Sequence, residues 1–222
     1  MRRICTLIPL FTAQAFCADA RLAIGLNAEM GYPLYKNTRR SFQSTFAPGT
    51  GLYIAYRPGN AKIFPSLTAG ISAFELPVYT AEFSDISADV TNKTVMLHLN
   101  IKSNEDNEKV EMYWFGGIGI NYFRPDTHLM RGGNSISATL YDDGSTYLYP
   151  AADLGLKYMR RVSQRYGIYI GAEAFIKYIW LYKNGNYYVD IATKQLNADI
   201  SGLIIQPAAL FSINYIFGQQ AY

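Results

Sequence analysis

Two histidines are the side chains in this chain of 222 residues that are best suited to moving a proton near neutral pH. His98 stands in the tripeptide His98-Leu99-Asn100, and His128 lies close to Asp126 and Arg131. A general base works only within hydrogen-bond reach of the group that it deprotonates. The surroundings of His98 predict a hydrogen-bonding residue in a polar interior, and those of His128 predict a solvated connector. We therefore expect no catalytic residue at either position.

The other polar motifs do not predict a metal or cofactor site. Two histidines far apart, with no cysteine beside them, cannot hold a structural zinc ion. The stretch 142–145, Asp-Asp-Gly-Ser, lacks the further ligands of a calcium loop and predicts a turn. The glycines at 116, 117 and 119 do not precede a helix, as those of a phosphate-binding loop do. These motifs therefore lead us to expect no metal and no cofactor. The chain also has no dense basic run, so we expect no nucleic acid partner.

Glu173 and Lys177 are four residues apart, which is the spacing of an ion pair on a helix surface. The stretch around them, YGIYIGAEAFIKYIW from Tyr166 to Trp180, also alternates between apolar residues and small or polar ones. Alternation with a period of two is typical of a β-strand. Because the same alternation recurs along the chain, we predict a strand here.

Eight segments alternate in this way, and we predict that all of them are strands. They are Leu22–Tyr32, Gly51–Arg57, about Lys62–Phe74, Val95–Lys102, Val110–Phe123, about Ala151–Met159, Tyr166–Trp180 and Leu203–Phe217. Three of the connectors between them are short. The other four are expected to be long loops: Pro33–Thr50, Glu75–Lys93, Arg124–Pro150 and Leu181–Gly202. Connectors that alternate between long and short are typical of an outer-membrane barrel.

The polar faces of these segments indicate which solvent the apolar faces meet. Charged residues make up only 17% of the chain, below the roughly 25% of a soluble domain. The polar faces are rich in Gly, Ala and Ser, which suit a narrow interior. The charges on these faces nearly balance, as expected in a closed lumen, because an unpaired buried charge is costly. We predict a polar network in the lumen made of Glu29, Arg57, His98, Lys102, Glu111, Asp153, Lys157, Glu173 and Lys177.

Glu173 and Lys177 point to the same side of one strand and lie too far apart to pair with each other. Their partners are therefore expected on neighbouring strands, at Asp153 or Lys157 of the preceding segment.

Aromatic residues gather near the ends of the apolar faces. Amphipathic rings of this kind form girdles at the two membrane–water interfaces of a barrel, although tyrosine is also simply a good strand residue. We predict a girdle of Tyr32, Tyr56, Trp114, Tyr122, Tyr158, Tyr166, Tyr178, Trp180, Tyr215 and Phe217.

The first twenty residues differ from the rest. Arg2 and Arg3 precede an apolar stretch too short to span a membrane comfortably, and Ala18-Asp19-Ala20 matches a cleavage site. We predict a signal peptide at 1–20, with Ala15 as a second possible cleavage site, and a barrel domain at 21–222. The only cysteines, at 5 and 17, fall in the signal segment, so no disulfide is expected in the mature chain.

These features together resemble the small outer-membrane β-barrels of Gram-negative bacteria, of the OmpA transmembrane domain, OmpX and opacity-protein kind. The terminal strand, Phe211-Ser212-Ile213-Asn214-Tyr215-Ile216-Phe217, is similar to the signal that the barrel-assembly machinery reads, although five residues follow it. The resemblance implies an all-β fold: an antiparallel up-and-down transmembrane barrel of about eight strands, with long extracellular loops and short periplasmic turns. It also implies contacts with outer-membrane lipid and lipopolysaccharide.

Three functions remain open within this architecture. We expect a non-enzymatic protein of the bacterial outer membrane that has a structural or surface-interaction role through its extracellular loops, with a protein or glycan as ligand. The first alternative is a narrow, porin-like channel for small solutes. The second is an enzyme that modifies lipid A. A barrel lipid-A deacylase carries a His-x-Ser pair on its lipid-facing wall, whereas His98 is followed by Leu99 and Asn100 and has lumen parity.

Overall fold

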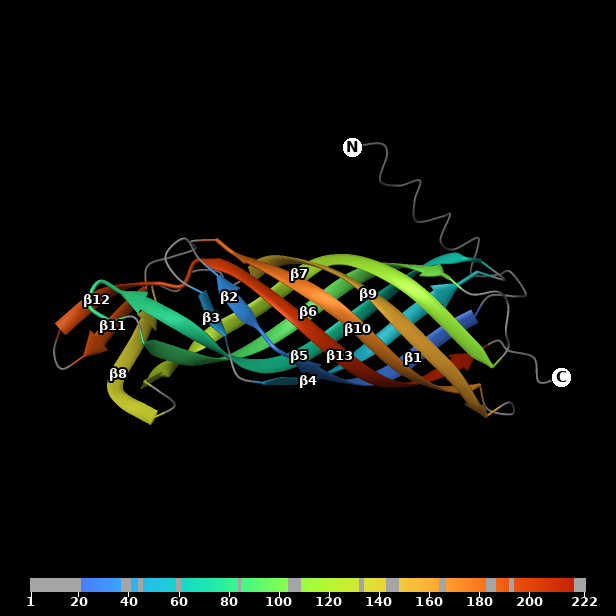
Figure 1. Cartoon of the computed structure of the whole chain (residues 1–222), viewed down its shortest axis with the longest axis horizontal. Helices are drawn as coiled ribbons and strands as arrows, with labels where there is room; N and C mark the ends of the chain where they lie inside the picture. The colour runs from blue at the N-terminus through green and yellow to red at the C-terminus, as the bar shows by residue number, and fades with distance from the viewer. Residues whose placement is uncertain are drawn as a thin grey trace, which may run out of the picture.

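The strands form where apolar and polar residues alternate with the period of a β-strand. In the computed structural model shown in Figure 1 they join a single antiparallel sheet that wraps into an elongated barrel. The structure describes residues 21–36, 41–43, 46–58, 61–83, 85–103, 109–131, 134–142, 148–163, 167–182, 187–191 and 194–217. The expected signal peptide at 1–20 lies outside these ranges.

Thirteen strands occur within the described ranges. They are β1 (Arg21–Gly31), β2 (Leu34–Lys36), β3 (Ser41–Gln43), β4 (Ala47–Arg57), β5 (Ile63–Thr80), β6 (Ile86–Lys102), β7 (Val110–Arg131), β8 (Asn134–Asp142), β9 (Leu148–Ser163), β10 (Ile168–Leu181), β11 (Tyr187–Ile191), β12 (Lys194–Asp199) and β13 (Gly202–Phe217). In the described part of the chain, no helix is long and apolar enough to cross a membrane.

Strand pairing closes into a ring. The longer strands pair in the order β1, β4, β5, β6, β7, β9, β10 and β13, and β13 pairs back with β1. Closure leaves these strands without a free edge, so each can satisfy its backbone groups on both sides. The expected all-β antiparallel fold is confirmed. The expected count of about eight strands is not confirmed, because the sheet as a whole has thirteen.

The five shorter strands lie toward one end of the barrel (Figure 1). β8 pairs with β7 and β11, β11 with β12, and β12 with the end of β5, while β2 pairs with β13 and β3. We call these five strands, together with the adjoining ends of β5, β6 and β7, the extension. We call the opposite end, where β1 begins and β13 ends, the turn end.

The four segments expected as long loops are largely β-structure, so that prediction was wrong. β5 continues to Thr80 and β6 begins at Ile86, which leaves only a short connector within Glu75–Lys93. Pro33–Thr50 contains β2, β3 and the start of β4, and Arg124–Pro150 contains the end of β7, β8 and the start of β9. Leu181–Gly202 contains β11 and β12.

The missed strand ends have a physical cause in the phase of the alternation. On β5 the apolar residues Ile63 and Ile71 face outward and are about half exposed, whereas Leu76 and Val78, of the opposite parity, are wholly buried inside. The backbone keeps its period of two, but the apolar residues change sides. A sequence test that keeps one phase therefore ends the strand at the change.

The interior has an apolar part and a polar part. A large apolar cluster lies in the extension and the adjoining part of the ring, and it includes Leu76, Ile86, Leu129, Ile179 and Val189. Two smaller apolar clusters lie further toward the turn end, and ionised side chains lie among them.

Candidate functional site

The outer wall of the ring exposes large apolar side chains on every strand. The most exposed are Leu26 on β1, Ile118 on β7, Leu154 on β9 and Ile213 on β13, which are 62–69% exposed. A water-soluble monomer rarely presents a contiguous apolar surface of this extent. The side chains that alternate with them point into the lumen and are mostly buried.

Two ion pairs lie in the lumen near the turn end. Arg57 Nη1 on β4 lies 3.1 Å from Glu111 Oε1 on β7, and the Tyr113 hydroxyl donates a hydrogen bond to the same carboxylate. Lys157 Nζ on β9 lies 2.7 Å from Glu173 Oε1 on β10 and 3.5 Å from the centre of the Tyr53 ring. Each buried charge therefore meets an opposite charge, as an enclosed site requires.

His98 on β6 pairs with Asp153 on β9, with 2.9 Å between Nε2 and Oδ2. Its other ring nitrogen, Nδ1, lies 3.4 Å from the Thr68 hydroxyl. The order hydroxyl, imidazole and carboxylate is that of a catalytic relay. Here, however, the imidazole is buried in the lumen, and Phe115 packs edge-on against it with 5.3 Å between ring centres. This enclosure favours a structural role for His98.

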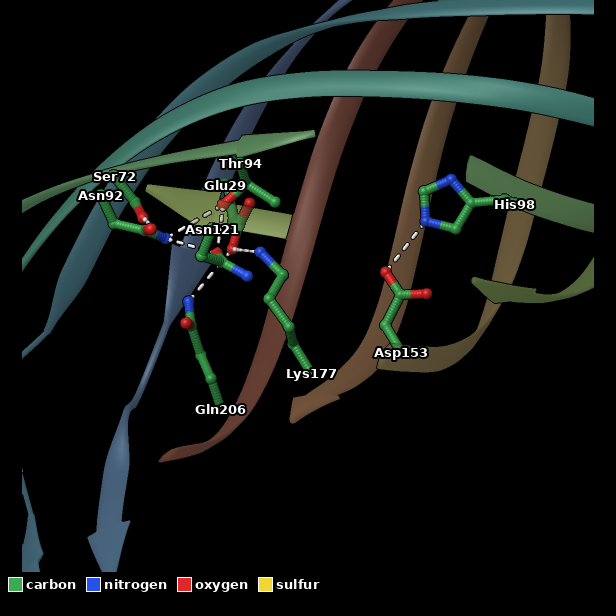
Figure 2. Close-up of polar contacts among 9 residues, drawn as sticks. All are labelled: Glu29, Ser72, Asn92, Thr94, His98, Asn121, Asp153, Lys177 and Gln206. Atoms are coloured by element: carbon green, nitrogen blue, oxygen red, sulfur yellow. Dashed lines mark hydrogen bonds and ion pairs between the residues drawn. The ribbon is translucent and has the colours of Figure 1, made fainter. Parts of the chain in front are cut away.

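A third polar cluster in the lumen consists of two groups of contacts, one among β1, β10 and β13 and one among β5, β6 and β7 (Figure 2). Lys177 Nζ lies 3.3 Å from Glu29 Oε1, and the Gln206 amide donates a hydrogen bond of 3.1 Å to the same oxygen. Beside it, the Asn92 amide nitrogen donates to Asn121 Oδ1 at 3.0 Å.

Asn92 also links this cluster to β5, because its amide lies 3.4 Å from the Ser72 hydroxyl. The Thr94 hydroxyl completes the group by donating to Asn121 Oδ1 at 2.6 Å. Asn92, Asn121 and Gln206 have no exposed surface, so polar side chains fill this level of the lumen.

The structure places eight of the nine predicted lumen residues in these contacts. Lys102 is half-buried at the turn end of β6. Glu173 contacts Lys157, one of the two partners expected for it. The expected partner of Lys177 was wrong: this lysine reaches Glu29 on β1, two strands away, while Asp153 contacts His98. A closed barrel brings strands together across the lumen, which neighbour relations along the sequence do not show.

The amide part of the network was not predicted from the sequence. Asn92 fell in a segment that was expected to be a loop, and Asn121 and Gln206 lie in segments predicted as strands but were not included in the predicted network. The sequence feature that could have identified them is a set of amide residues at inward-facing positions. These residues lie on both sides of the point where the apolar side chains change from the outer face of the strand to the inner face. Within the described residues, no group of three or more His, Cys, Asp or Glu side chains is arranged to hold a metal ion.

The predicted girdle residues within the described ranges are on the outer face, and Tyr166 lies outside those ranges. Tyr32, Trp114, Tyr122, Tyr158, Trp180, Tyr215 and Phe217 are 41–52% exposed, and Tyr56 and Tyr178 are half-buried. Tyr178 stacks on Trp180, and Tyr215 contacts Phe217 edge-on. Aromatic rings therefore lie outside the barrel toward both of its ends.

The extension has the opposite arrangement of side chains from the outer wall of the ring. Its interior is apolar, with Leu140 and Val189 buried. Its outer face carries polar residues and a cross-strand pair of exposed tyrosines, Tyr141 on β8 and Tyr188 on β11. This is the arrangement of a β-structure surrounded by water.

Comparisons with known proteins find similarity only at the level of structure. No protein-family model matches the sequence, and no curated protein matches it. The crystal structure of a major outer membrane protein from Thermus thermophilus is similar with a TM-score of 0.50 and 10% identity, over 87% of this chain and 99% of that chain.

Two further solved structures are similar to this chain. Neisserial surface protein A has a TM-score of 0.48 and 11% identity, over 87% of this chain and 97% of that one. Ail, the attachment invasion locus protein of Yersinia pestis, has a TM-score of 0.46 and 11% identity, over 90% and 99%. The likeness to the Thermus thermophilus protein shows that the chain has the fold of a bacterial outer-membrane protein, and the expected resemblance is confirmed at the level of the fold.

Proposed function

We propose that this chain is a non-enzymatic integral protein of the bacterial outer membrane. In this proposal the eight ring strands form a transmembrane wall, the turn end faces the periplasm, and the extension is held outside the cell. The extension presents a surface that binds an extracellular protein or glycan. The wall contacts outer-membrane lipid and lipopolysaccharide, and the barrel-assembly machinery inserts it.

One observation carries the proposal: the apolar side chains change from the outside of the sheet to the inside at one level of neighbouring strands. On β6 the outward residues Val95 and Leu97 are apolar, whereas Thr91 and Lys93, which also face outward, are polar. Apolar side chains facing outward need a hydrocarbon solvent, and polar side chains facing outward need water. A membrane boundary at this level accounts for both.

The height of the apolar wall supports the same placement. On β7 the outward apolar residues run from Met112 to Tyr122. Ten residue steps of about 3.3 Å, on a strand tilted by about 40°, give a height of about 25 Å. This equals the apolar band of about 25 Å that outer-membrane barrels present.

The filled lumen supports a non-conducting barrel. Two of its glycines lie where side chains of the adjacent strand β13 need room: a Cβ at Gly31 would overlap the Gln206 amide, and one at Gly171 would overlap the Ser212 hydroxyl. Toward the extension, the large apolar cluster occupies the interior. An open channel is therefore not favoured.

The exposed tyrosine pair supports the surface-interaction role. Tyr141 and Tyr188 lie opposite each other on adjacent strands, 50% and 37% exposed, and Asn197 lies opposite Tyr188 on the next strand. Rigid amphipathic rings beside amide groups are typical of recognition surfaces, because they provide contact area with little loss of conformational entropy.

The membrane placement is tested with single-cysteine variants labelled by a membrane-impermeant maleimide on intact cells. Thr91→Cys should be labelled and Val95→Cys should be protected, although the two residues are only four positions apart on one face. Equal labelling of both would overturn the placement. Unboiled protein in detergent should also migrate differently from boiled protein on a gel, as closed barrels do.

The surface role is tested by binding to glycan arrays and to cultured cells. The double variant Tyr141→Ser/Tyr188→Ser should lose binding, and Gln195→Ser, on the outer face of β12, serves as the control. Lipid A from cells with and without the protein should have identical mass spectra. A modified lipid A would replace the proposal with the enzymatic alternative.

A further inference from the structure

The outer wall contains a groove of roughly 590 Å³ near the seam where the two ends of the chain pair. Side chains of β1, β9, β10 and β13 line it, and apart from backbone they are almost entirely apolar. It lies in the band that the proposed function places in the membrane, so the inference rests on that placement.

The groove exists because small and large residues occupy one cross-strand row. Ala28, Phe211 and Ala172 are consecutive neighbours across β1, β13 and β10, and Tyr158 of β9 follows Ala172. Phe211 is 58% exposed and stands above the alanines on both sides. The hollow over Ala172 is therefore one strand wide, about 4.8 Å, which is also about the width of an extended alkyl chain.

A positive charge lies at the periplasmic edge of this groove. Arg160 on β9 faces outward, is exposed, and is directly opposite Ile170, which lines the groove. Its neighbour on the other side is Val110, so neither cross-strand neighbour supplies a carboxylate. A guanidinium group binds a phosphate through paired N–H donors, and its charge attracts an anionic membrane surface.

We propose that the groove binds one glycerophospholipid of the periplasmic leaflet, with an acyl chain over Ala172 and the phosphate on Arg160. The combination of an apolar hollow and a cation at its edge matches the two ends of this ligand. A second copy of the chain fits less well. Two copies inserted in the same direction would hold their Arg160 side chains at the same depth on facing walls, where the like charges repel.

The test is native mass spectrometry of the detergent-purified, delipidated full chain, titrated with dimyristoylphosphatidylglycerol. Dimyristoylglycerol, which lacks the phosphate, serves as the second probe. The wild-type chain should bind one molecule of the phospholipid more tightly than any further molecule. Arg160→Gln should weaken phospholipid binding by about fivefold, the effect expected for one cation at an anionic lipid surface, and should leave dimyristoylglycerol binding unchanged.

Ala172→Phe fills the hollow and should weaken binding of both probes at least as strongly. The matched controls are Lys62→Gln, an exposed cation near the same end, and Ala152→Phe, an outward alanine of β9 outside the groove. Both controls should bind like the wild type. Because all four substitutions lie on the outer surface, folding is checked by the boiled-versus-unboiled gel shift.

Unchanged binding in both groove variants would overturn the proposal, and so would a dimer that dissociates in Ala172→Phe without any lipid adduct. If the folded chain inserts into vesicles but shows either result, the proposed function survives and only the lipid site fails. If the chain does not insert, the proposed function and the lipid site fail together.

Discussion

Replacing Glu173 by glutamine removes the counter-charge of a buried lysine. Lys157 and Glu173 are 2.7 Å apart, and their side chains are only 2% and 11% exposed. Removing one partner of a buried ion pair costs about 3–5 kcal/mol, because the other charge is left without compensation. The Tyr53 ring still faces the ammonium group in the variant. We therefore expect Glu173→Gln to lower the free energy of unfolding by about 3 kcal/mol, the lower end of that range.

The assay is urea unfolding of the barrel in lipid vesicles, followed by the fluorescence of Trp114 and Trp180. Both indole rings lie on the outer wall and are about half exposed, so unfolding moves them from lipid to water. With a slope of about 2 kcal/mol per molar urea, the expected loss moves the midpoint down by about 1.5 M. The double variant Glu173→Gln/Lys157→Met should recover most of this loss, because it removes both charges together.

The control is Glu82→Gln in the connector between β5 and β6. Glu82 also contacts a lysine, Lys194, but these side chains are 42% and 61% exposed. An exposed pair contributes about 0–1 kcal/mol, so the midpoint should hardly move. If Glu173→Gln shifts the midpoint no further than Glu82→Gln does, or if the double variant is no more stable than the single one, Lys157 and Glu173 are not a buried pair in a packed lumen.

Three further predictions follow from the packing. Gly117→Ala places a Cβ against the His98 ring and should lower stability by about 1–3 kcal/mol in the same urea assay. Gly116→Ala, whose Cβ meets nothing nearer than 3.7 Å, should have little effect, and equal losses would contradict the packing. Val189→Asp should make the extension sensitive to protease while the gel shift of the barrel persists. Tyr188→Asp, on the outer face, should leave the extension resistant to protease. If both variants resist protease, the extension has no apolar core. In planar bilayers the protein should give a flat current trace, and discrete conductance steps would restore the channel alternative.

Much of the wall was predictable because a strand fixes the side of every second residue. On β6, for example, Leu97 and Leu99 were expected outside and His98 inside, and the structure places them so. The charges on the inner face were equally recognisable, because ionised residues are rare in such segments. Which charges meet was less predictable. The contact of Lys177 with Glu29 depends on closure of the ring, since Glu29 lies 148 positions earlier in the chain.

The extension was hidden for a different reason. Its strands alternate as regularly as the others. Their apolar residues, however, occupy the inward-facing positions, which in the wall of the ring are occupied by polar residues. Beyond the change, the inward residues of β6 are Val90, Ala88 and Ile86, all at most 2% exposed. The criterion that one face of a strand stays apolar ends the predicted strand at these residues. The criterion that apolar and polar residues alternate, whichever face is apolar, would have continued β6 into the extension.

In the proposed membrane placement, the change of phase therefore locates the outer membrane boundary more closely than hydrophobicity does. Ile71 on β5 is paired with Lys93 on β6, and Lys93 is paired with Tyr122 on β7. These three outward residues form one cross-strand row, and it contains the last exposed large apolar residue of β5, the first lysine of β6 and a tyrosine. Lys93 Nζ lies 6.0 Å from the centre of the Tyr122 ring, so a cation and an amphipathic ring adjoin at this level. Such residues together suit neither bulk water nor hydrocarbon, only the interface between them. Inside the barrel, the buried residues next to this row, Ser72, Asn92 and Asn121, are polar, whereas the interior of the extension beyond them is apolar. A wall in lipid and a β-structure in water need opposite residues on their two faces.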